Sequence, residues 1–268
     1  MKTENIKPIQ VDNGEKDRHF VTSLARGLEV LRAFRPGEGA VGNAEIATRT
    51  GLPKSTVSRL TSTLVQLGYL IHREDQSRYE PSPTVLSLGY TFLANSRLRL
   101  MAAPAMREVA RNTGYSLALG ARHKLNMLYV EAARGAKAST LVLEVGSYIP
   151  IANTAMGRAF LAGMPEMERD FVLDSIRHHS GVEWPILKTG IEKSLIDYEE
   201  KGFCVSIGEW QRATHAVGVP IRDKAKGDLM AINCGCSAYL ASPEELIEDL
   251  GPQLVSLARG VEIMCGQG

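Results

Sequence analysis

Apolar side chains recur at helical spacing early in the chain. Over residues 22–34 one appears every three or four positions, which predicts a helix with one buried face. These side chains are Leu24, Leu28, Leu31 and Phe34. A Pro-Gly pair ends this helix, and Asn43 is expected to open a short second helix over 44–50. A third helix is expected after the glycine corner at Gly51, with Ser55 as its cap.

Two short strands are expected next, over 69–72 and 78–80, around a polar turn. Three helices followed by such a hairpin form a winged helix-turn-helix over residues 20–83. Basic and hydroxyl side chains at the start of the third helix point away from its apolar face, where they can meet phosphates and base edges. They are Lys54, Thr56, Ser58 and Arg59. DNA binding is favoured, and a small three-helix interaction module with a solvated polar face is the alternative.

The pattern changes after residue 83. Apolar positions over 84–100 predict a linker helix that separates the two modules and pairs with a partner subunit, or else a first core helix of the second domain. Strand-like runs and helical stretches then follow over 101–268. Strands are expected over 116–121, 127–132, 140–145, 203–207, 213–221 and 228–236. Helices are expected over 154–162, 166–176, 188–201 and 243–264. This order predicts an α+β protein whose second domain is one antiparallel sheet covered by helices.

Composition restricts the classes of protein that remain. The 268 residues are enough for two domains, and 44% hydrophobic with 23% charged residues describes a globular protein. The net charge is only +1, but the charge that matters for DNA binding is local. Residues 44–68 carry Arg49, Lys54 and Arg59 against Glu45, and this small positive excess means that DNA affinity would depend on dimerisation and base contacts. Residues 1–19 are expected to form a disordered arm. With no run long enough for a membrane span and no signal-peptide core, we expect a cytoplasmic protein.

Six segments of the chain occur in a characteristic order. They are SLARGLEVL (23–31), GLPKSTVSRL (51–60), LGYL (67–70), NTAMGRAFLA (153–162), KGF (201–203) and VGVPI (217–221). Together they resemble the IclR family of bacterial transcriptional regulators. The resemblance implies a winged helix-turn-helix that binds near-palindromic double-stranded operator DNA as a dimer or tetramer, with a GAF-like effector-binding domain behind it. It also implies control of a catabolic operon by a small organic acid, often an aromatic one, with repression favoured over activation.

The resemblance further implies which side chains bind DNA. Those at the start of the recognition helix would read the operator, and three arginines elsewhere would hold phosphates. The first group is Lys54, Ser55, Thr56, Ser58 and Arg59, and the second is Arg26, Arg73 and Arg78. For Arg26, a surface or subunit-interface salt bridge is the alternative.

A carboxylate site is expected where the helix over 154–162 begins. Free backbone N–H groups at a helix N-terminus attract anions, and by the resemblance those of Ala155 and Met156 would hold the effector's acid group. An ordinary helix capped by Thr154 or Asn153 is the alternative. The remaining walls are expected to be Leu141, Ile149, Ser206, Thr214, His215, Ala216, Asn233 and Gly235. The small or weakly polar members of this set favour a carboxylate larger than the small oxoacids, such as an aromatic acid.

Other chemistry has weaker support. Cys234 and Cys236 lie on one side of a strand, and with Cys204 or His215 they could bind zinc, but their spacing is not that of zinc knuckles. A redox-sensing thiol is a second alternative. No nucleophile elbow, phosphate loop or His-Glu-x-x-His motif occurs. We therefore expect no cofactor, no metal and no catalytic residues, with a thiol- or metal-dependent enzyme as the alternative function.

Overall fold

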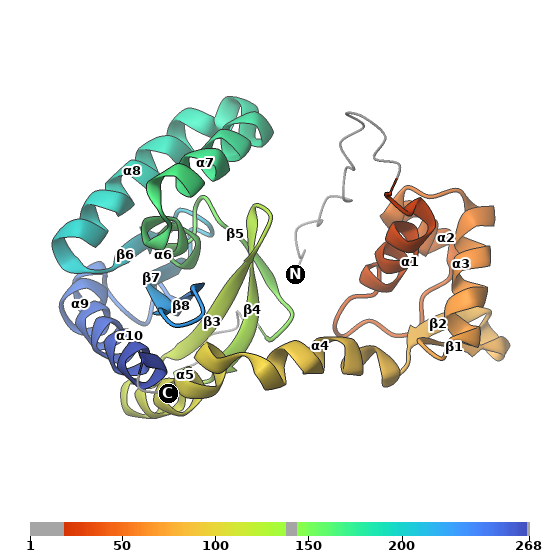
Figure 1. Ribbon diagram of the computed structural model, residues 1–268, viewed down its shortest axis with the longest axis horizontal. Coiled ribbons are helices and arrows are strands. Elements are labelled where there is room, and N and C mark those ends of the chain that lie inside the picture. The colour runs from red at the N-terminus through yellow and green to blue at the C-terminus, as the bar shows by residue number, and fades with distance from the viewer. Residues whose placement is uncertain (1–18, 138–143, 267–268) are drawn as a thin grey trace. The chain divides into compact units, whose positions relative to one another are not determined.

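The computed structural model describes residues 19–137 and 144–266, and the chain divides into two compact units between Phe92 and Leu93 (Figure 1). Apart from His19, the expected disordered arm lies outside the described residues. The first unit contains α1 (Thr22–Arg32), α2 (Asn43–Thr50), α3 (Lys54–Gln66), β1 (Leu70–Arg73), the 3₁₀ turn η1 (Glu74–Gln76), β2 (Arg78–Pro81) and most of α4 (Thr84–Asn95).

The first unit is a three-helix bundle with a two-stranded wing, as the sequence predicts. Gly51 has a φ of +69° at the corner between α2 and α3, a left-handed conformation that glycine adopts without strain. The antiparallel pairing of β1 and β2 runs from Leu70 opposite Pro81 to Arg73 opposite Arg78. The helices and the wing enclose one small core, formed by Val30, Val41, Ile46, Val57, Leu64 and Leu70 among others.

Local details of the first unit differ from the expectation. Ser55 does not cap α3, because the helix already begins at Lys54 after Pro53. Asn43 is the first residue of α2 rather than its cap, and its side-chain oxygen accepts a hydrogen bond from the Thr61 hydroxyl at 3.2 Å. Leu24 and Leu28, expected to be buried, are 63% and 48% exposed, because Val30 and the following Ala33, just after the end of α1, contribute to the core instead.

The expected linker helix over 84–100 is interrupted. α4 ends at Asn95, and α5 (Arg97–Thr113) begins after the buried Ser96. Leu98 is buried in the core of the second unit, so residues 97–100 pack as the first turn of a core helix. Pro104 lies inside α5, where its missing N–H removes one helical hydrogen bond.

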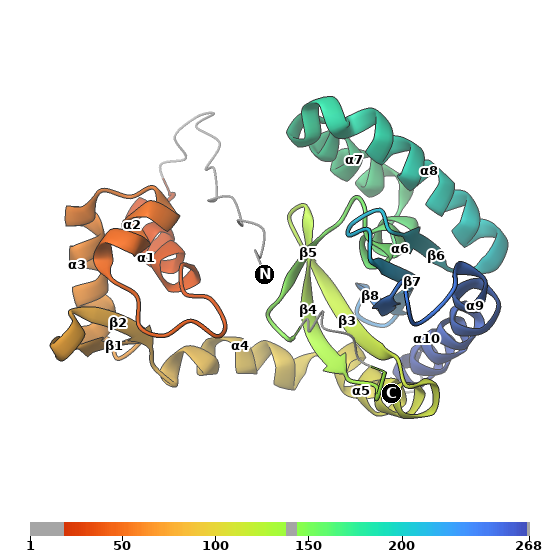
Figure 2. The ribbon, with the colours of Figure 1, turned by 180° about the vertical axis from the view of Figure 1, so that it is seen from behind.

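The second unit is a three-layer α/β/α domain. Its sheet is antiparallel throughout, in the order β5-β4-β3-β8-β7-β6. Helices α6, α7 and α8 cover one face, and α5 and α10 cover the other (Figures 1 and 2). The strands are β3 (Ser116–His123), β4 (Asn126–Ala133), β5 (Tyr148–Pro150), β6 (Cys204–Ile207), β7 (Thr214–Asp223) and β8 (Asp228–Ser237). The helices are α5, α6 (Ala155–Gly163), α7 (Glu166–Ser180), η2 (Gly181–Glu183), α8 (Trp184–Lys201), α9 (Pro243–Glu245), the π-helical turn η3 (Leu246–Leu250) and α10 (Gly251–Gly266).

Alternation along β7 and β8 gives the two sheet faces different sizes of side chain. Branched residues such as Val217 and Ile232 face α5 and α10, whereas the other face carries Ala216, Gly218 and Gly235. Small residues on that second face leave space for a helix terminus and a cavity.

The strand expected over 140–145 lies mostly outside the described residues, and the two described positions, 144 and 145, are not in a strand.

Two glycines allow close backbone packing around the start of α6, one with the sheet and one with the segment before the helix. A Cβ atom at Gly218 in β7 would lie 2.5 Å from the carbonyl oxygen of Ala155. A Cβ atom at Gly157 in α6 would lie 2.1 Å from the carbonyl oxygen of Ile151. Since neither approach leaves room for a side chain, glycine at both positions fixes the depth at which the α6 N-terminus sits.

Candidate functional sites

A cavity of about 90 Å³ lies on the α6 side of the sheet, beside the first residues of α6. Thr154 caps this helix: its hydroxyl accepts a hydrogen bond from the Gly157 N–H at 3.1 Å and donates one to the Pro150 carbonyl at 2.6 Å. The cap leaves two first-turn N–H groups, those of Ala155 and Met156, without an acceptor in the described part of the chain. A helix N-terminus with free N–H groups is suited to bind an anion.

Most of the residues expected at the effector site meet around this cavity. Those that line it are Ile149, Thr154, Ala155, Ser206, Thr214, Ala216, Asn233 and Gly235. The Ser206 hydroxyl donates a hydrogen bond to the Asn153 carbonyl at 3.1 Å, which ties β6 to the loop before α6. Leu141, also expected here, lies outside the described residues.

Two of the expected residues do not line the cavity. Met156 is buried, and its side chain packs against Gly120 of β3, so only its backbone N–H could take part in binding there. His215 lies between Thr214 and Ala216 on β7, and strand alternation therefore turns its side chain to the opposite face. Of these three consecutive residues, Thr214 and Ala216 therefore line the cavity and His215 does not.

The structure adds residues that the sequence analysis missed. They are Ser116, Leu117, Ala118, Tyr129, Ala132, Ala133, Arg134, Trp210 and Cys236. Tyr129 could have been found, because it lies on a predicted strand whose alternate positions face the same layer as α6. Trp210 lies in the loop between β6 and β7, and no periodic signal reports where a loop side chain points.

A buried polar pair faces this side of the sheet from two strands. The Asn233 side-chain amide in β8 donates a hydrogen bond to the Tyr129 hydroxyl in β4 at 3.4 Å. Burial raises the pKa of Tyr129 to about 12, so its hydroxyl keeps its proton at neutral pH. The Asn233 Oδ1 atom is buried and has no hydrogen-bond partner within the described residues.

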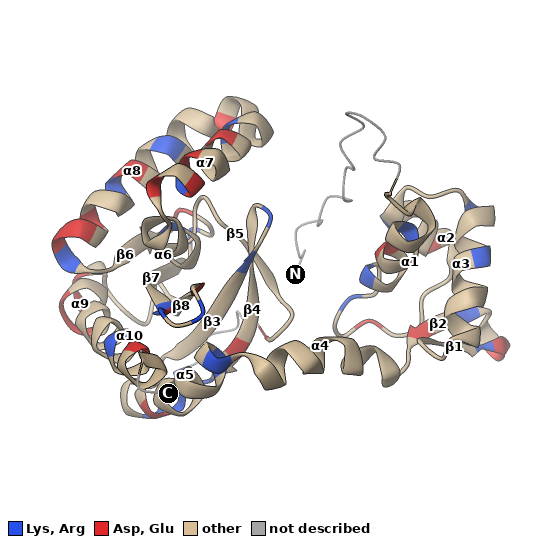
Figure 3. Ribbon diagram, viewed as in Figure 1, with Lys and Arg blue, Asp and Glu red and all other residues tan. Residues whose placement is uncertain are grey.

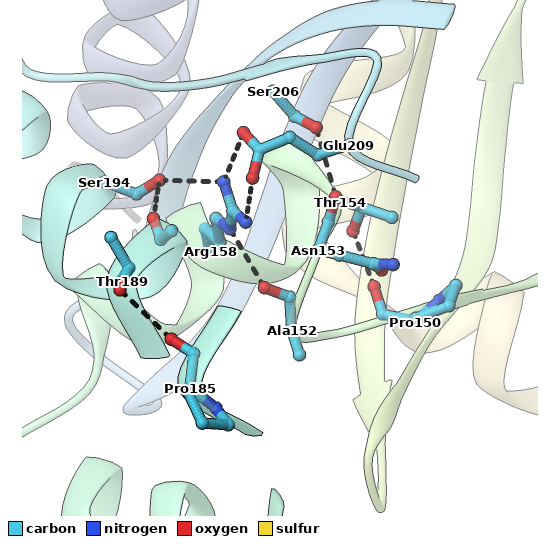
Figure 4. Close-up of polar contacts among 11 residues, drawn as sticks. Pro150, Ala152, Asn153, Thr154, Arg158, Pro185, Thr189, Ser194, Ser206 and Glu209 are labelled. Atoms are coloured by element: carbon cyan, nitrogen blue, oxygen red, sulfur yellow. Dashed lines mark hydrogen bonds and ion pairs between the residues drawn. The ribbon is translucent and has the colours of Figure 1, made fainter. Parts of the chain in front are cut away.

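An arginine at the first turns of α6 connects the loops around the cavity. Arg158 is 2% exposed and forms a bidentate ion pair with Glu209, at 2.8 and 2.5 Å (Figure 4). Its Nε atom also donates to the Ala152 carbonyl at 2.9 Å, and one terminal nitrogen reaches the Ser194 hydroxyl in α8 at 3.4 Å. Glu209 directly precedes Trp210, so this ion pair holds the loop that closes one wall of the cavity.

The first unit presents a basic and hydroxyl-rich face on α3. Lys54, Ser55, Ser58 and Arg59 are exposed, and Thr56 is half-buried beside the core residue Val57. α3, which is described over its whole length, carries positive but no negative charge (Figure 3). Neither Lys54 nor Arg59 has an ion-pair partner among the described residues. Their charges are therefore available to an external anion.

The arginines of the wing are less available. Arg73 forms an ion pair with Glu80, and the Arg78 guanidinium donates to the Ala40 carbonyl at 2.7 Å. The tip between them carries Glu74 and Asp75. Arg26 is exposed on α1. The wing thus has a smaller positive excess than its arginines alone indicate.

Arg49 has a structural role instead of adding to the DNA-facing charge. Its guanidinium pairs with Glu38 at 2.5 Å and with Glu45, and it donates to the Ala33 carbonyl at 2.7 Å. The hydrogen bond with Glu38 is the main reason that the pKa of Arg49 is raised. This cluster joins α2 to the end of α1.

The cysteines are poor candidates for metal or redox chemistry. All four are buried free thiols. Burial raises the pKa of Cys204 and Cys234 to about 12 and that of Cys236 to about 11. Since the thiolate is the form that binds metals and attacks oxidants, such thiols are unreactive near neutral pH. No group of three or more potential metal ligands occurs among the described residues.

Two protein-family models match this chain. Residues 23–73 match the IclR helix-turn-helix domain, and residues 90–262 match the C-terminal domain of the bacterial transcriptional regulator IclR. The chain belongs to the IclR family. It is accordingly a transcriptional regulator and not an enzyme, with an IclR-type DNA-binding domain followed by the family's C-terminal α/β domain. None of the described helices is both long and apolar enough to cross a membrane.

Individual IclR-type regulators match over nearly the full length. The HTH-type transcriptional regulator TsaQ1/TsaQ2 of Comamonas testosteroni is 31% identical over 98% of this chain and 94% of its own. The Pca regulon regulatory protein of Pseudomonas putida is 30% identical over 94% of this chain and 86% of its own. A crystal structure of an IclR family regulator from Brucella abortus is 42% identical, with a TM-score of 0.82 over 96% of this chain and 97% of that chain. The agreement therefore covers both units.

Proposed function

We propose that this IclR-type protein binds operator DNA through α3 and changes its DNA affinity when a small organic acid occupies the cavity beside α6. The observation that carries the acid site is the pair of free N–H groups at Ala155 and Met156, next to a cavity of about 90 Å³. We further propose that the protein works in the cytoplasm on a catabolic operon, as a repressor. The relative named for the Pca regulon supports control of a set of genes.

For DNA recognition, the exposed face of α3 is the element that enters the major groove. Ser55 and Ser58 can meet base edges, while Lys54 and Arg59 bind phosphates or guanine. Arg26 adds a phosphate contact from α1. In this proposal Arg73 and Arg78 contribute less than the resemblance implies, because each already has a partner and the wing tip is acidic.

One copy of the chain offers few basic side chains to DNA, so we propose that two copies bind one operator. With Arg26, Lys54 and Arg59 from each copy, about six phosphates would be neutralised, which gives a slope of about −5 for log K against log salt concentration. Exposed apolar side chains on α1 and α4 support self-association as a dimer or a tetramer. They include Leu24, Leu28, Leu86, Leu88, Tyr90 and Phe92.

For the effector, an acid group would accept hydrogen bonds from the Ala155 and Met156 N–H groups, helped by the positive end of the α6 dipole. Apolar walls from Ile149, Trp210 and Ala216 suit a hydrocarbon ring or chain. An acid of this kind changes DNA affinity only if it binds the DNA-competent and DNA-incompetent states with different affinities. A small aromatic carboxylate fits these requirements.

The separate roles of α3 in DNA binding and of the α6 N-terminus in acid binding are testable with two matched pairs of variants. Arg59→Ala should weaken binding to the DNA upstream of the protein's own gene about tenfold and leave acid binding unchanged, whereas Lys193→Ala on exposed α8 should alter neither. Thr154→Ala, which removes the α6 cap, should weaken binding of benzoate and its derivatives, and Thr154→Ser should retain it. DNA binding is measured by fluorescence anisotropy and acid binding by titration calorimetry. Loss of acid binding in Arg59→Ala with intact DNA binding would reject the assignment.

A further inference from the structure

The cavity contains a second polar site besides the α6 N-terminus. Tyr129 and Asn233 are 5% and 8% exposed, and both line the cavity. They come from strands on either side of β3, so the sheet itself fixes their separation. Nothing in the acid-binding role of α6 uses either side chain. Two buried polar groups held this closely in a mostly apolar cavity need a reason.

The hydrogen-bonding capacity of the pair is only partly used. The Asn233 amide nitrogen donates to the Tyr129 hydroxyl at 3.4 Å, so the tyrosine oxygen acts as the acceptor there. The Tyr129 proton then points elsewhere, and no contact among the described residues accepts it. Asn233 Oδ1 is likewise without a donor in the described chain. Side by side, the pair thus offers one donor and one acceptor.

We propose that the effector carries a hydroxyl group, in addition to its acid group, which accepts a hydrogen bond from Tyr129 and donates one to Asn233. This inference rests on the proposed effector site. The three groups would form a closed ring of hydrogen bonds. The Asn233 amide nitrogen donates to the Tyr129 hydroxyl, that hydroxyl donates to the ligand hydroxyl, and the ligand hydroxyl donates to the Asn233 amide oxygen. If the amide is turned over, every bond in the ring reverses direction, and a hydroxyl still completes it.

Few other functional groups can complete this ring. Ether, ketone and ionised carboxylate oxygens only accept hydrogen bonds, and an ammonium group only donates them. Without a ligand, a water molecule can satisfy the pair, and a ligand that displaces the water without replacing both hydrogen bonds loses affinity. Selection for a hydroxyl therefore follows from the pair, since each competing group leaves one partner unsatisfied.

The surroundings of the pair set the size of the ligand. A Cβ atom at Gly235, on the floor of the cavity, would have only the Asn233 amide nitrogen within 4 Å, at 3.8 Å. The free volume of about 90 Å³ is several times the minimum that one water molecule requires. Ile149 and Trp210 supply apolar walls. The class of ligand is thus a hydroxylated carboxylic acid with a ring-sized hydrocarbon body.

The test compares acids that differ only by a hydroxyl. Benzoate is paired with 2-, 3- and 4-hydroxybenzoate, and cyclohexanecarboxylate with its hydroxylated derivatives, in calorimetric titrations of the full chain. At least one hydroxylated acid should bind about ten- to a hundredfold more tightly than its parent. Tyr129→Phe should bring this ratio close to one. Tyr198→Phe, half-buried on α8 and away from the cavity, should keep the ratio.

Each outcome separates this inference from the proposed acid site. Equal binding of parent and hydroxylated acids, or a preference that survives both Tyr129→Phe and Asn233→Leu, would overturn the hydroxyl assignment and leave the acid site standing. If phenol and cyclohexanol bind as tightly as the hydroxylated acids, the carboxylate contributes no affinity. That result would support the role of Tyr129 and Asn233 and reject the acid site. Binding of none of these probes would reject both.

Discussion

The seating of α6 on the sheet can be tested by adding a single methyl group. Gly218 and Gly235 lie on the same face of the sheet, on neighbouring strands. A Cβ atom at Gly218 would lie 2.5 Å from the Ala155 carbonyl oxygen and 3.0 Å from the Met156 nitrogen. At Gly235 the nearest atom would be the Asn233 amide nitrogen at 3.8 Å, an ordinary contact. The same substitution to alanine therefore meets backbone at one position and open space at the other.

These distances give opposite expected effects on stability. Replacing glycine by alanine stabilises a compatible site by about 0.4–1 kcal/mol, since it restricts the unfolded chain. Overpacking against atoms that cannot move away costs about 1–3 kcal/mol. Gly235→Ala should thus leave the free energy of unfolding unchanged or slightly higher. Gly218→Ala should lower it by about 1–2 kcal/mol, and move the first turn of α6 away from the sheet.

Urea unfolding followed by circular dichroism measures both variants against the unsubstituted protein. We expect similar native spectra, an unchanged midpoint for Gly235→Ala and a lower midpoint for Gly218→Ala. Calorimetric titration with benzoate adds a second readout, because displacement of the Ala155 and Met156 N–H groups should weaken acid binding. A Gly218→Ala variant as stable as Gly235→Ala would refute the close approach of α6 to β7.

Three further predictions concern buried groups. Glu209→Ala removes the ion-pair partner of Arg158, which is 2% exposed, so the free energy of unfolding should fall by about 2 kcal/mol. Glu192→Ala, at an exposed ion pair, should change it by less than about 0.5 kcal/mol, and equal urea midpoints for the two variants would contradict this. At neutral pH, Cys204 and Cys234 of the native protein should react with a thiol reagent only as fast as the protein unfolds, because both are buried and neither lines the cavity. Rapid labelling of either would contradict this. Burial raises the pKa values of Cys204 and Cys234 from 9.0 to about 12, so in the unfolded chain these thiols ionise at lower pH than in the folded protein. Their contribution to the free energy of unfolding should therefore be fully present below pH 9 and be lost as the pH rises towards 12. A free energy of unfolding that stays constant over that range would show that the two thiols are not buried.

Features that depend on residues close together in the sequence could be predicted. The α6 cap could be predicted because Thr154 satisfies the Gly157 N–H three residues later, within a single turn. The shared face of Asn233 and Gly235 followed from the period of two in a strand. The same rule, applied along β7, would also have excluded His215 from the wall formed by Thr214 and Ala216.

Features that depend on contacts between distant segments could not be predicted. The pairing of Arg158 with Glu209 joins residues 51 positions apart, and Trp210 reaches the cavity from a loop without periodicity. The approach of α6 to Gly218 depends on backbone atoms whose positions no sequence pattern reports. On α1, helical spacing identified Leu24 and Leu28 as an apolar face but could not say whether this chain or a second copy covers it.

The central claim is that an acid in the α6 cavity changes DNA binding, and one pair of titrations tests it directly. Fluorescently labelled DNA from upstream of the protein's own gene is titrated with the unsubstituted protein and with Gly235→Leu, whose side chain would fill the cavity, with and without hydroxybenzoates. We predict that the acid shifts the DNA affinity of the unsubstituted protein and that Gly235→Leu binds DNA normally without responding. An equal acid-induced shift in Gly235→Leu would contradict the account, because the acid would then be acting elsewhere.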